Sequence, residues 1–454
     1  MTPKLVVVGG GVAGLAAARA ARRAAREEDM SLDITLLETG DRLGGNVLTE
    51  NIDGAALDWG PDSFLAAKQR GRDVVEELGL AGDLVPTGPA ARHVYLLVEG
   101  DLRPLPGGLV MGVPARPTAL VEAVRRGILS PAGAVRASME PLVRRRPGPD
   151  PSAGELARAR LGDEAARRLV EPVVRAVHGA PADEIGADTA FPWASGHSSL
   201  TVTAARRPRP TGPMFIGMRG GMAGLVDGLS GDLGETEVRT ESRAGPIEEA
   251  GSRYRIPVGD ESVRADGVVV AVAAPDAATI LGSVAPDASR QMAGVRYSAS
   301  AVILMRFAPE KLGRPLEASG YLVAPDEDSV VTACSFFSTK WPHLDDPSGR
   351  WLRAVVTDPD ALALPDEGLM HRVGVEVSTA LRARGGPDRI LMRRWDPALP
   401  IYAPGHSARV AAARATLPDR VALAGAYVDG VGLPDCIRTG EQAARGVVRV
   451  LARR

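Results

Sequence analysis

The chain has 454 residues, 45% of them hydrophobic, and 54 Lys and Arg nearly balance 56 Asp and Glu for a net charge of −2. This length exceeds what one core organises, so two or three domains are expected. The balanced charge gives no general attraction to nucleic acid or to a membrane surface. Two cysteines fit a reducing cytoplasm, and no stretch is apolar for long enough to span a bilayer. The six histidines show no metal-ligand spacing, so we expect no metal.

The first residues contain the most specific pattern in the chain. An apolar strand over Leu5–Val8 runs into Gly9, Gly11 and Gly14, and an alanine-rich helix pattern follows over Val12–Arg26. Gly9 permits a tight turn, Gly11 lets the backbone approach a pyrophosphate, and Gly14 lets the helix pack on the strand. The helix N-terminus offers its N–H groups to phosphates. The pattern predicts a dinucleotide site, with a purely structural glycine turn as the alternative.

A second group of residues follows the next expected strand, Asp33–Leu37. Glu38 stands roughly twenty residues after the glycines, where a carboxylate accepts hydrogen bonds from a ribose. Arg42 suits a phosphate because its guanidinium binds in a bidentate manner, and Gly44 and Gly45 extend the ligand path beyond the ribose. An FAD enzyme needs this extension because flavin lengthens the cofactor. The alternative is a surface turn with a solvated arginine.

Three further glycine-containing segments fit contacts to a flavin. Gly60–Leu65 suggests backbone close to the isoalloxazine ring, and Arg219–Leu225 suggests a loop entering a helix behind it. Gly425–Glu441 is a glycine-rich strand end before a terminal helix, whose N–H groups would stabilise negative charge on a reduced flavin. An ordinary turn or helix start is the alternative for each. Cys436 has no histidine nearby in sequence, which favours a buried structural thiol over a nucleophile.

The remaining chain divides by its apolar pattern. Helical spacing recurs through 106–205, which predicts a mostly helical region, and Ser152 with Glu155 fits a capping box. Short apolar alternations over 297–356 predict an antiparallel sheet. The final helix is expected over Thr439–Ala452.

Taken together, these residues resemble the oxygen-dependent protoporphyrinogen/coproporphyrinogen oxidase family over essentially the whole chain. The resemblance is carried by Gly60–Leu65, Val110–Pro114, Lys340–His343 and Gly430–Ile437. The last three are most similar to the soluble branch of Gram-positive bacteria, which acts on coproporphyrinogen III. The resemblance implies an α/β fold: a Rossmann-like FAD-binding domain of the amine-oxidase type, a mixed-sheet substrate domain and a helical domain. The boundaries it implies are 1–85, 206–290 and 390–454 for the FAD domain, 86–105 and 291–389 for the substrate domain, and 106–205 for the helical domain.

The resemblance also implies which residues bind the cofactor and the substrate. The residues expected along FAD are Gly9, Gly11, Val12, Ala13, Gly14, Glu38, Thr39, Arg42, Gly44, Gly45, Asn46, Gly60, Pro61, Asp62, Ser63, Val238, Trp395, Val431, Gly432 and Leu433. Arg92 and Lys68 are expected to meet substrate propionates. Ile401 stands where family members commonly carry Gln, so a hydrogen bond assigned to that Gln does not carry over.

The implied activity is the oxidation of coproporphyrinogen III to coproporphyrin III in haem biosynthesis, with O₂ as acceptor and H₂O₂ as product. The flavin carries the chemistry, so no catalytic side chain is expected. The alternatives are a protoporphyrinogen IX oxidase, another FAD oxidase of the amine-oxidase type, and a non-catalytic protein that binds FAD or haem. A cytoplasmic monomer or homodimer with transient contact to ferrochelatase is expected.

Overall fold

The computed structural model describes residues 2–143, 147–194, 199–208 and 212–453. The chain forms two compact units, and each is assembled from separate stretches of sequence. The first unit comprises Met1–Pro86, Pro213–Arg296 and His406–Arg454, and the second comprises Thr87–Gly212 and Tyr297–Gly405. The division into three domains stays a prediction.

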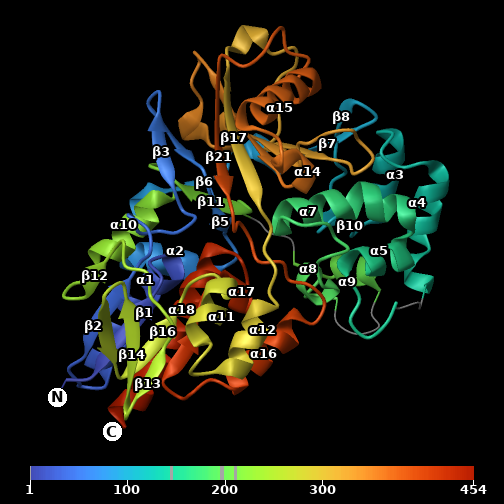
Figure 1. The fold of residues 1–454 in the computed structure, drawn as a ribbon. Helices are drawn as coiled ribbons and strands as arrows, with labels where there is room; N and C mark the ends of the chain where they lie inside the picture. Colours follow the sequence, from blue (N-terminus) through green and yellow to red (C-terminus); the bar gives the residue numbers. More distant parts are fainter. Residues whose placement is uncertain (1, 144–146, 195–198, 209–211, 454) are drawn as a thin grey trace. The chain divides into compact units, whose positions relative to one another are not determined.

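The first unit is built on a five-stranded parallel sheet in the order β12–β2–β1–β16–β22 (Figure 1). Its strands are β1 (Lys4–Val8), β2 (Asp33–Leu37), β12 (Glu237–Arg239), β16 (Gly267–Val270) and β22 (Val421–Leu423). This is the strand order of a Rossmann sheet, with β1 at the centre. Ligands bind such sheets at the carboxyl ends of the central strands, which here means the residues after Val8 and Leu37.

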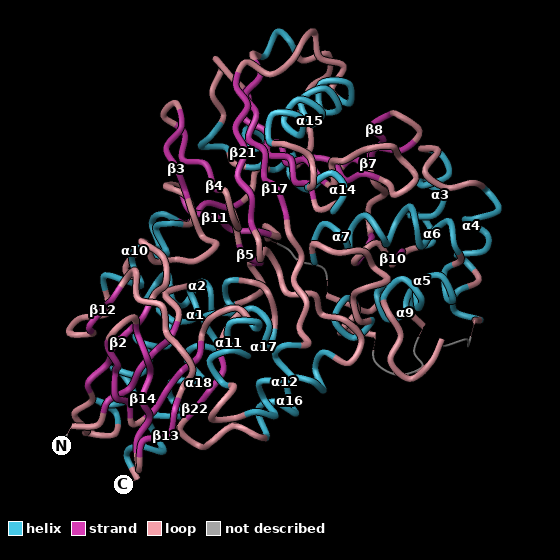
Figure 2. The backbone as a smooth tube through the Cα atoms, in the orientation of Figure 1, coloured by secondary structure: helices cyan, strands magenta, loops and turns pink. Residues whose placement is uncertain are grey.

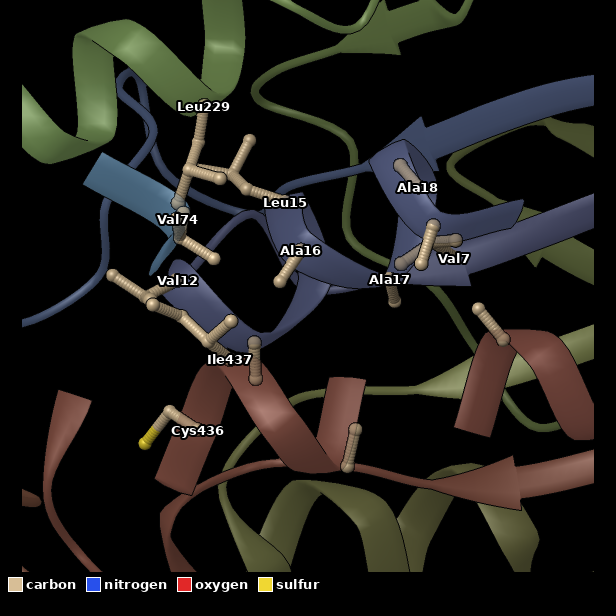
Figure 3. Close-up of a cluster of buried hydrophobic side chains, with 14 of the residues drawn as sticks. Val7, Val12, Leu15, Ala16, Ala17, Ala18, Val74, Leu229, Cys436 and Ile437 are labelled. Carbon is tan, nitrogen blue, oxygen red and sulfur yellow. The ribbon is translucent and has the colours of Figure 1, made fainter. Parts of the chain in front are cut away.

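Helices α1 (Val12–Glu27) and α18 (Leu433–Ala452) pack together in the core of this unit. Small residues permit the close approach: a Cβ on Gly440 of α18 would lie 2.1 Å from the carbonyl oxygen of Ala13 in α1. Figure 3 shows Ile437 of α18 beside Val12 of α1. The two ends of the sequence therefore form one core.

The predicted start of the final helix at Thr439 is wrong, because α18 begins at Leu433. Pro434 is tolerated in the first turn, where its missing N–H would have no intrahelical partner. Gly440 lies inside the helix because its position faces the backbone of α1. Pro434 thus lies in the first turn of the helix, and Gly440 makes a packing contact with α1.

Shorter elements complete the first unit, with three small antiparallel sheets among them. The strands are β3 (Thr49–Ile52), β4 (Ala55–Asp58), β5 (Phe64–Leu65), β6 (Leu84–Pro86), β11 (Phe215–Met218), β13 (Glu248–Ala250), β14 (Arg253–Val258) and β15 (Glu261–Ala265). The helices are α2 (Gln69–Glu77), α10 (Ala223–Gly231), α11 (Ala274–Leu281), α12 (Pro286–Ala293), α16 (His406–Ala415) and α17 (Ala426–Asp429).

The second unit contains a seven-stranded sheet in the order β21–β17–β20–β19–β18–β7–β8. Figure 2 labels four of its strands, β21, β17, β7 and β8. Its strands are β7 (Tyr95–Val98), β8 (Asp101–Pro104), β17 (Ser300–Phe307), β18 (Gly320–Val323), β19 (Ala333–Phe336), β20 (Arg350–Val356) and β21 (Arg389–Trp395). The β18–β7 pair is parallel and the others are antiparallel, so the sheet is mixed. Apolar side chains on one face pack with those of α15 (Asp366–Ala380). Two short helices, α13 (Phe337–Lys340) and α14 (Pro359–Leu362), follow strands of this sheet.

The rest of the second unit is mainly helical. Its elements are β9 (Leu109–Val110), β10 (Val113–Pro114), α3 (Pro117–Arg125), α4 (Pro131–Ser138), α5 (Ala153–Leu161), α6 (Asp163–Ala165), α7 (Glu171–His178), α8 (Ala187–Ala190) and α9 (Leu200–Ala205). The predicted capping box is confirmed: the Ser152 hydroxyl accepts from the Glu155 N–H, and the Glu155 carboxylate accepts from the Ser152 N–H. No helix in the described ranges is both long and apolar enough to cross a membrane.

Candidate functional site

The glycine turn between β1 and α1 is shaped by close backbone contacts. A Cβ on Gly14 would lie 1.8 Å from the Gly9 carbonyl oxygen, and one on Gly9 would lie 2.6 Å from the Ala271 carbonyl oxygen. Gly11 differs, because a Cβ there would meet no protein atom within 4 Å. The first two glycines are thus required by the fold itself, whereas Gly11 borders open space.

The N-terminus of α1 is suited to an anion. Gly11 is its N-cap, no side chain caps the first turn, and no acidic residue occupies that turn. The N–H groups of the first turn, at Val12 and Ala13 among others, therefore keep their capacity to donate. The partial positive charge of the helix dipole acts at the same place.

Glu38 at the end of β2 lies directly beside this turn. Its carboxylate accepts the Gly10 N–H at 2.6 Å and the Gly40 N–H at 2.7 Å, one on each oxygen. Each carboxylate oxygen has a second lone pair, so Glu38 is able to accept further hydrogen bonds from a ribose. Thr39, the next residue, is exposed.

The Arg42–Asn46 loop lies against the glycine turn. The Gly44 N–H donates to the Gly10 carbonyl at 2.8 Å, and a Cβ on Gly45 would lie 3.4 Å from the Cα of Gly11. The Arg42 guanidinium donates to carbonyls of its own loop, at Gly45 (2.6 Å) and at Val47 (3.0 Å). Arg42 therefore shapes this loop, and its contact with a phosphate stays a prediction.

The segment Gly60–Ser63 continues from this loop. A Cβ on Gly60 would lie 1.9 Å from the Asn46 carbonyl oxygen, so the two backbones touch. Within the segment, the buried Asp62 carboxylate accepts the Ser63 hydroxyl at 2.9 Å, and Pro61 lies between Gly60 and this pair. The glycine turn, the loop and this segment form one continuous backbone surface.

Val238 occupies the other flank of the turn, on edge strand β12. It is paired with Leu36 of β2 and is 39% exposed. The Glu38 N–H donates to the carbonyl of the next residue, Arg239, at 2.8 Å. Val238 thus lies near the Glu38 carboxylate that is expected to hold the ribose.

The loop before α18, with Val431, Gly432 and Leu433, is held by a buried carboxylate that sequence reasoning missed. Asp435 is 6% exposed, and a Cβ on Gly430 would lie 2.7 Å from its Cγ. Lys68 Nζ donates to both Asp435 oxygens, at 2.7 and 3.0 Å. Lys68, expected to meet substrate, is therefore ion-paired with the carboxylate that contacts this loop, and its contact with a propionate stays a prediction.

Two other contacts that the sequence did not reveal fix nearby segments. The Asp58 carboxylate accepts the Met222 N–H at 2.9 Å, which holds the start of α10. The buried imidazole of His406 donates through Nε2 to the Tyr427 carbonyl at 2.7 Å, next to the loop that leads into α18. His406 gave no sequence signal because a single histidine at a helix start fits any surface position.

Three predicted residues belong to the second unit. Arg92 is exposed at the end of a short 3₁₀ helix, Pro89–Arg92, and Trp395 ends β21 opposite Ser300. Ile401 is 7% exposed inside an apolar cluster. Its apolar surroundings match the absence of a polar side chain at this position.

The two thiols show no sign of nucleophile activation. Burial, reinforced by the charge of Asp435, raises the pKa of the Cys436 thiol to about 12. Burial also raises the pKa of the Cys334 thiol well above its ordinary value. Across the described part of the chain, no cluster of three or more His, Cys, Asp or Glu side chains suits a metal ion.

Comparison with known proteins defines the class. The model of the flavin containing amine oxidoreductase family matches residues 12–448, and the chain belongs to this family. The protein is accordingly an oxidoreductase with FAD as its cofactor.

The chain is also similar to individual members of this family. The chain is 30% identical to the coproporphyrinogen III oxidase of Bacillus subtilis (strain 168), with 98% of each chain covered. It is 32% identical to the coproporphyrinogen III oxidase of Mycobacterium tuberculosis (strain ATCC 25618 / H37Rv), with 99% of each covered. A solved structure from Exiguobacterium sp. 255-15, provisionally described as a protoporphyrinogen oxidase, is 29% identical over 99% of each chain with a TM-score of 0.87. These likenesses confirm the predicted family and fold class.

The residues of the first unit fit FAD. The open space at Gly11, the uncapped first turn of α1 and the spare acceptor capacity of Glu38 match a pyrophosphate joined to a ribose. The backbone surface continues through Gly44, whose N–H donates to the Gly10 carbonyl, and through Gly60, which packs against the Asn46 carbonyl.

Proposed function

We propose that this protein oxidises coproporphyrinogen III to coproporphyrin III, with O₂ as electron acceptor and H₂O₂ as product. The observation that carries the proposal is the full-length similarity to relatives named coproporphyrinogen III oxidase. The overall change removes six electrons and six protons from the macrocycle, and three O₂ take them up as three H₂O₂. Bound FAD supplies the chemistry by accepting a hydride from a carbon atom and passing electrons to O₂.

The protein's own part is to bind and orient. The first turn of α1 holds the pyrophosphate, Glu38 holds the ribose, and the Gly44–Asn46 and Gly60–Ser63 backbones run along the cofactor. The N-terminus of α18, beginning at Leu433, would favour negative charge on a flavin bound beside it. The substrate ring needs no strong protein base to release a hydride, so position and electrostatics suffice.

Purified protein tests this proposal. It should be yellow and should convert coproporphyrinogen III into fluorescent coproporphyrin III, with one H₂O₂ released per two electrons. A colourless protein, or a flavoprotein that leaves coproporphyrinogen III unchanged in air beyond the spontaneous rate, would contradict it.

The second candidate is protoporphyrinogen IX oxidation, which the description of the Exiguobacterium structure favours. The two substrates differ in their number of propionates, four against two. A ratio of kcat/KM values above one for coproporphyrinogen III supports the first candidate, and a ratio below one supports the second.

We further propose that the protein acts in the cytoplasm as a monomer or homodimer and passes its product onward through transient contact with a ferrochelatase. The two reduced, buried cysteines support the compartment. Light scattering gives the oligomeric state. If the two enzymes make contact, metal insertion into the enzyme-bound porphyrin should be faster than insertion into free porphyrin. A product-transfer assay with and without a ferrochelatase measures this difference.

A further inference from the structure

Helix α7 of the second unit carries two polar side chains that the fold does not use. Arg175 and His178 are three positions apart, so they lie on one face of the last helical turn. Neither side chain forms a hydrogen bond or an ion pair within the described part of the chain. Ala176 and Val177, which stand between them, are exposed. This turn therefore reaches the surface of the unit and is accessible to a ligand.

The Arg175 guanidinium contains a buried donor without an acceptor. Its Nε is shielded from solvent and has no hydrogen-bond partner. Glu171, one turn earlier, forms no ion pair with it among the described residues. The Glu171 carboxylate accepts the Ala182 N–H at 2.9 Å instead, and burial raises the pKa of this carboxyl. Since an unpaired buried donor is costly, a ligand that brings an acceptor to Arg175 gains from satisfying it.

His178 has the complementary capability. Burial is the only cause that lowers the pKa of its imidazole, to about 4. The ring is therefore neutral near pH 7, and one of its nitrogens accepts a hydrogen bond. Arg175 offers donors alone. Because the Cβ atoms of residues three apart on a helix lie about 5–6 Å from one another, the pair suits a ligand with an acceptor and an N–H donor at similar spacing.

The last turn of α7 lies beside the segment that leaves strand β21 (Figure 1). A Cβ on Gly179, the residue after His178, would lie 3.2 Å from the Leu399 Cδ1 and 3.2 Å from the Ser298 Oγ. Leu399 stands four positions after Trp395, which is predicted to lie along the flavin. The two unused side chains are thus close in the fold to a segment that begins at a predicted cofactor contact.

The same surroundings contain Ile401, which stands where members of the family commonly carry Gln. Ile401 shares one apolar cluster with Val174 and Ala180, and these two residues flank His178 in the chain. A Gln side chain offers an acceptor and donors, whereas Ile offers neither. A neutral histidine offers both. His178 therefore brings to this part of the unit a hydrogen-bonding side chain of the kind that position 401 lacks.

We propose that Arg175 and His178 together bind one propionate-bearing pyrrole ring of the substrate. Arg175 binds the carboxylate, and the acceptor nitrogen of His178 binds the pyrrole N–H. The identity of the substrate rests on the proposed function. In coproporphyrinogen III every pyrrole ring carries one propionate, whereas two rings of protoporphyrinogen IX carry none.

The pair also distinguishes the substrate from the product. A porphyrinogen has four pyrrole N–H donors, and a porphyrin keeps two of them. The propionates are the same in both. Arg175 therefore binds substrate and product alike, whereas His178 favours the reduced substrate.

The experiment compares R175Q and H178F with wild type. Initial rates give kcat and KM for coproporphyrinogen III, and absorbance titration gives the Kd for coproporphyrin III. R175Q should raise both the KM and the Kd about tenfold, the size of one lost charged hydrogen bond. H178F should raise the KM about fivefold and the Kd less than about twofold. In both variants kcat should change less than about twofold, because neither residue supplies the redox chemistry.

Matched variants distinguish these effects from general ones. R167Q removes an exposed arginine of the turn before α7, and H371F removes an exposed histidine of α15. Both should retain the wild-type KM and Kd. H178Q keeps an acceptor and should restore the KM that H178F loses. R175K keeps the charge without the planar fork and should give a KM between those of wild type and R175Q.

Flavin absorbance and Tm identify a misfolded variant, and R175M or H178L then takes the place of R175Q or H178F. A wild-type KM and Kd on loss of the Arg175 guanidinium, or an equal rise in R167Q, would overturn the inference. So would a wild-type KM on loss of the His178 acceptor, or a KM that H178Q leaves raised. If wild type binds coproporphyrin III but oxidises no porphyrinogen, the proposed function fails. The Kd values for coproporphyrin III and, without air, for coproporphyrinogen III then decide the inference alone.

Discussion

In the first unit, strands β1 and β2 end at a surface made of backbone, where Gly9 and Gly44 pack closely on neighbouring residues, Gly11 borders open space, and the first-turn N–H groups of α1 keep their capacity to donate. In the second unit, the sheet offers a face of side chains, where Arg353 and Arg393 stand on either side of an apolar strand. A surface made of glycine backbone offers the same N–H and carbonyl groups in any sequence. It therefore suits a ligand that many enzymes share. A surface of side chains can distinguish between ligands, because each position has its own charge and shape.

The backbone surface of the first unit should tolerate substitution less well than the sheet face of the second unit. Gly14→Ala should have the largest effect. The new Cβ would lie 1.8 Å from the Gly9 carbonyl oxygen, so α1 must move away from the turn. We expect purification without flavin and a loss of about 2–3 kcal/mol in unfolding free energy, typical of overpacking against a rigid neighbour. The ratio of flavin to protein absorbance and a urea titration measure both effects.

Gly11→Ala distinguishes ligand contact from folding. A Cβ at Gly11 meets no protein atom within 4 Å, so the apoprotein should be as stable as wild type while its FAD affinity falls at least tenfold. Gly82→Ala is the control, since its Cβ also meets nothing within 4 Å and it is remote in sequence from the glycine turn. Wild-type FAD affinity in Gly11→Ala would place the pyrophosphate elsewhere.

The third prediction concerns the ion pairs that brace α1 and α2 in the first unit. Burial opposes ionisation of Glu77, but hydrogen bonds from Arg70, Arg19 and Arg23 outweigh it and hold the pKa of its carboxyl at about 2. Since this lies below the ordinary value of 4.5, the stabilisation is present above pH 4.5 and is lost as pH falls towards 2. After allowance for solvent screening, the loss amounts to about 1–2 kcal/mol.

Urea titrations measure this effect. They should run from roughly pH 6 to 2.5, a range that begins above the ordinary pKa of 4.5 and approaches the folded-state pKa of about 2. E77Q should be less stable than wild type at pH 6, and the difference should shrink on acidification. E76Q, at the exposed neighbouring position, should follow the wild-type curve. Parallel curves for E77Q and wild type would show that the arginine cluster does not depend on this carboxylate.

Features of each unit could be predicted from the sequence where the contacting residues are close together in the chain. Features that depend on residues far apart in the chain could not. The turn at Gly9–Gly14 was predicted because it depends on residues adjacent in the chain. The pairing of Lys68 with Asp435 was not, because 367 positions separate them. Likewise, the stacking of Arg353 on Phe337 depends on the register of β20 beside β19, which no local pattern encodes. The packing role of Gly440 was not predicted either, because the α1 backbone that it contacts lies at the other end of the sequence.

The fourth prediction asks whether Lys68 supports the Gly430–Leu433 loop or binds the substrate. Replacing it by Met in K68M leaves the buried Asp435 with only the more distant Arg438, at 3.5 Å, among its ion-pair partners in the described structure. The Gly430–Leu433 loop should loosen, and the FAD Kd should rise about tenfold, equivalent to about 1.4 kcal/mol. K68R keeps the pair and should restore the affinity. A raised substrate KM with unchanged FAD Kd would instead assign Lys68 to substrate binding.

The smallest effect is expected at the two cysteines, one in each unit. Cys436 lies in the first turn of α18, where the helix dipole would lower a thiol pKa, but burial and the charge of Asp435 prevail and raise the pKa to about 12. Cys334 lies in strand β19 of the seven-stranded sheet, where it is 1% exposed and belongs to the apolar cluster. Native protein at mildly alkaline pH should therefore incorporate no iodoacetamide, and urea-unfolded protein should incorporate two, as measured by mass spectrometry. Labelling of Cys436 alone in the native protein would mean that the first turn of α18 opens. The first unit would then be more mobile at Cys436 than the second unit is at Cys334.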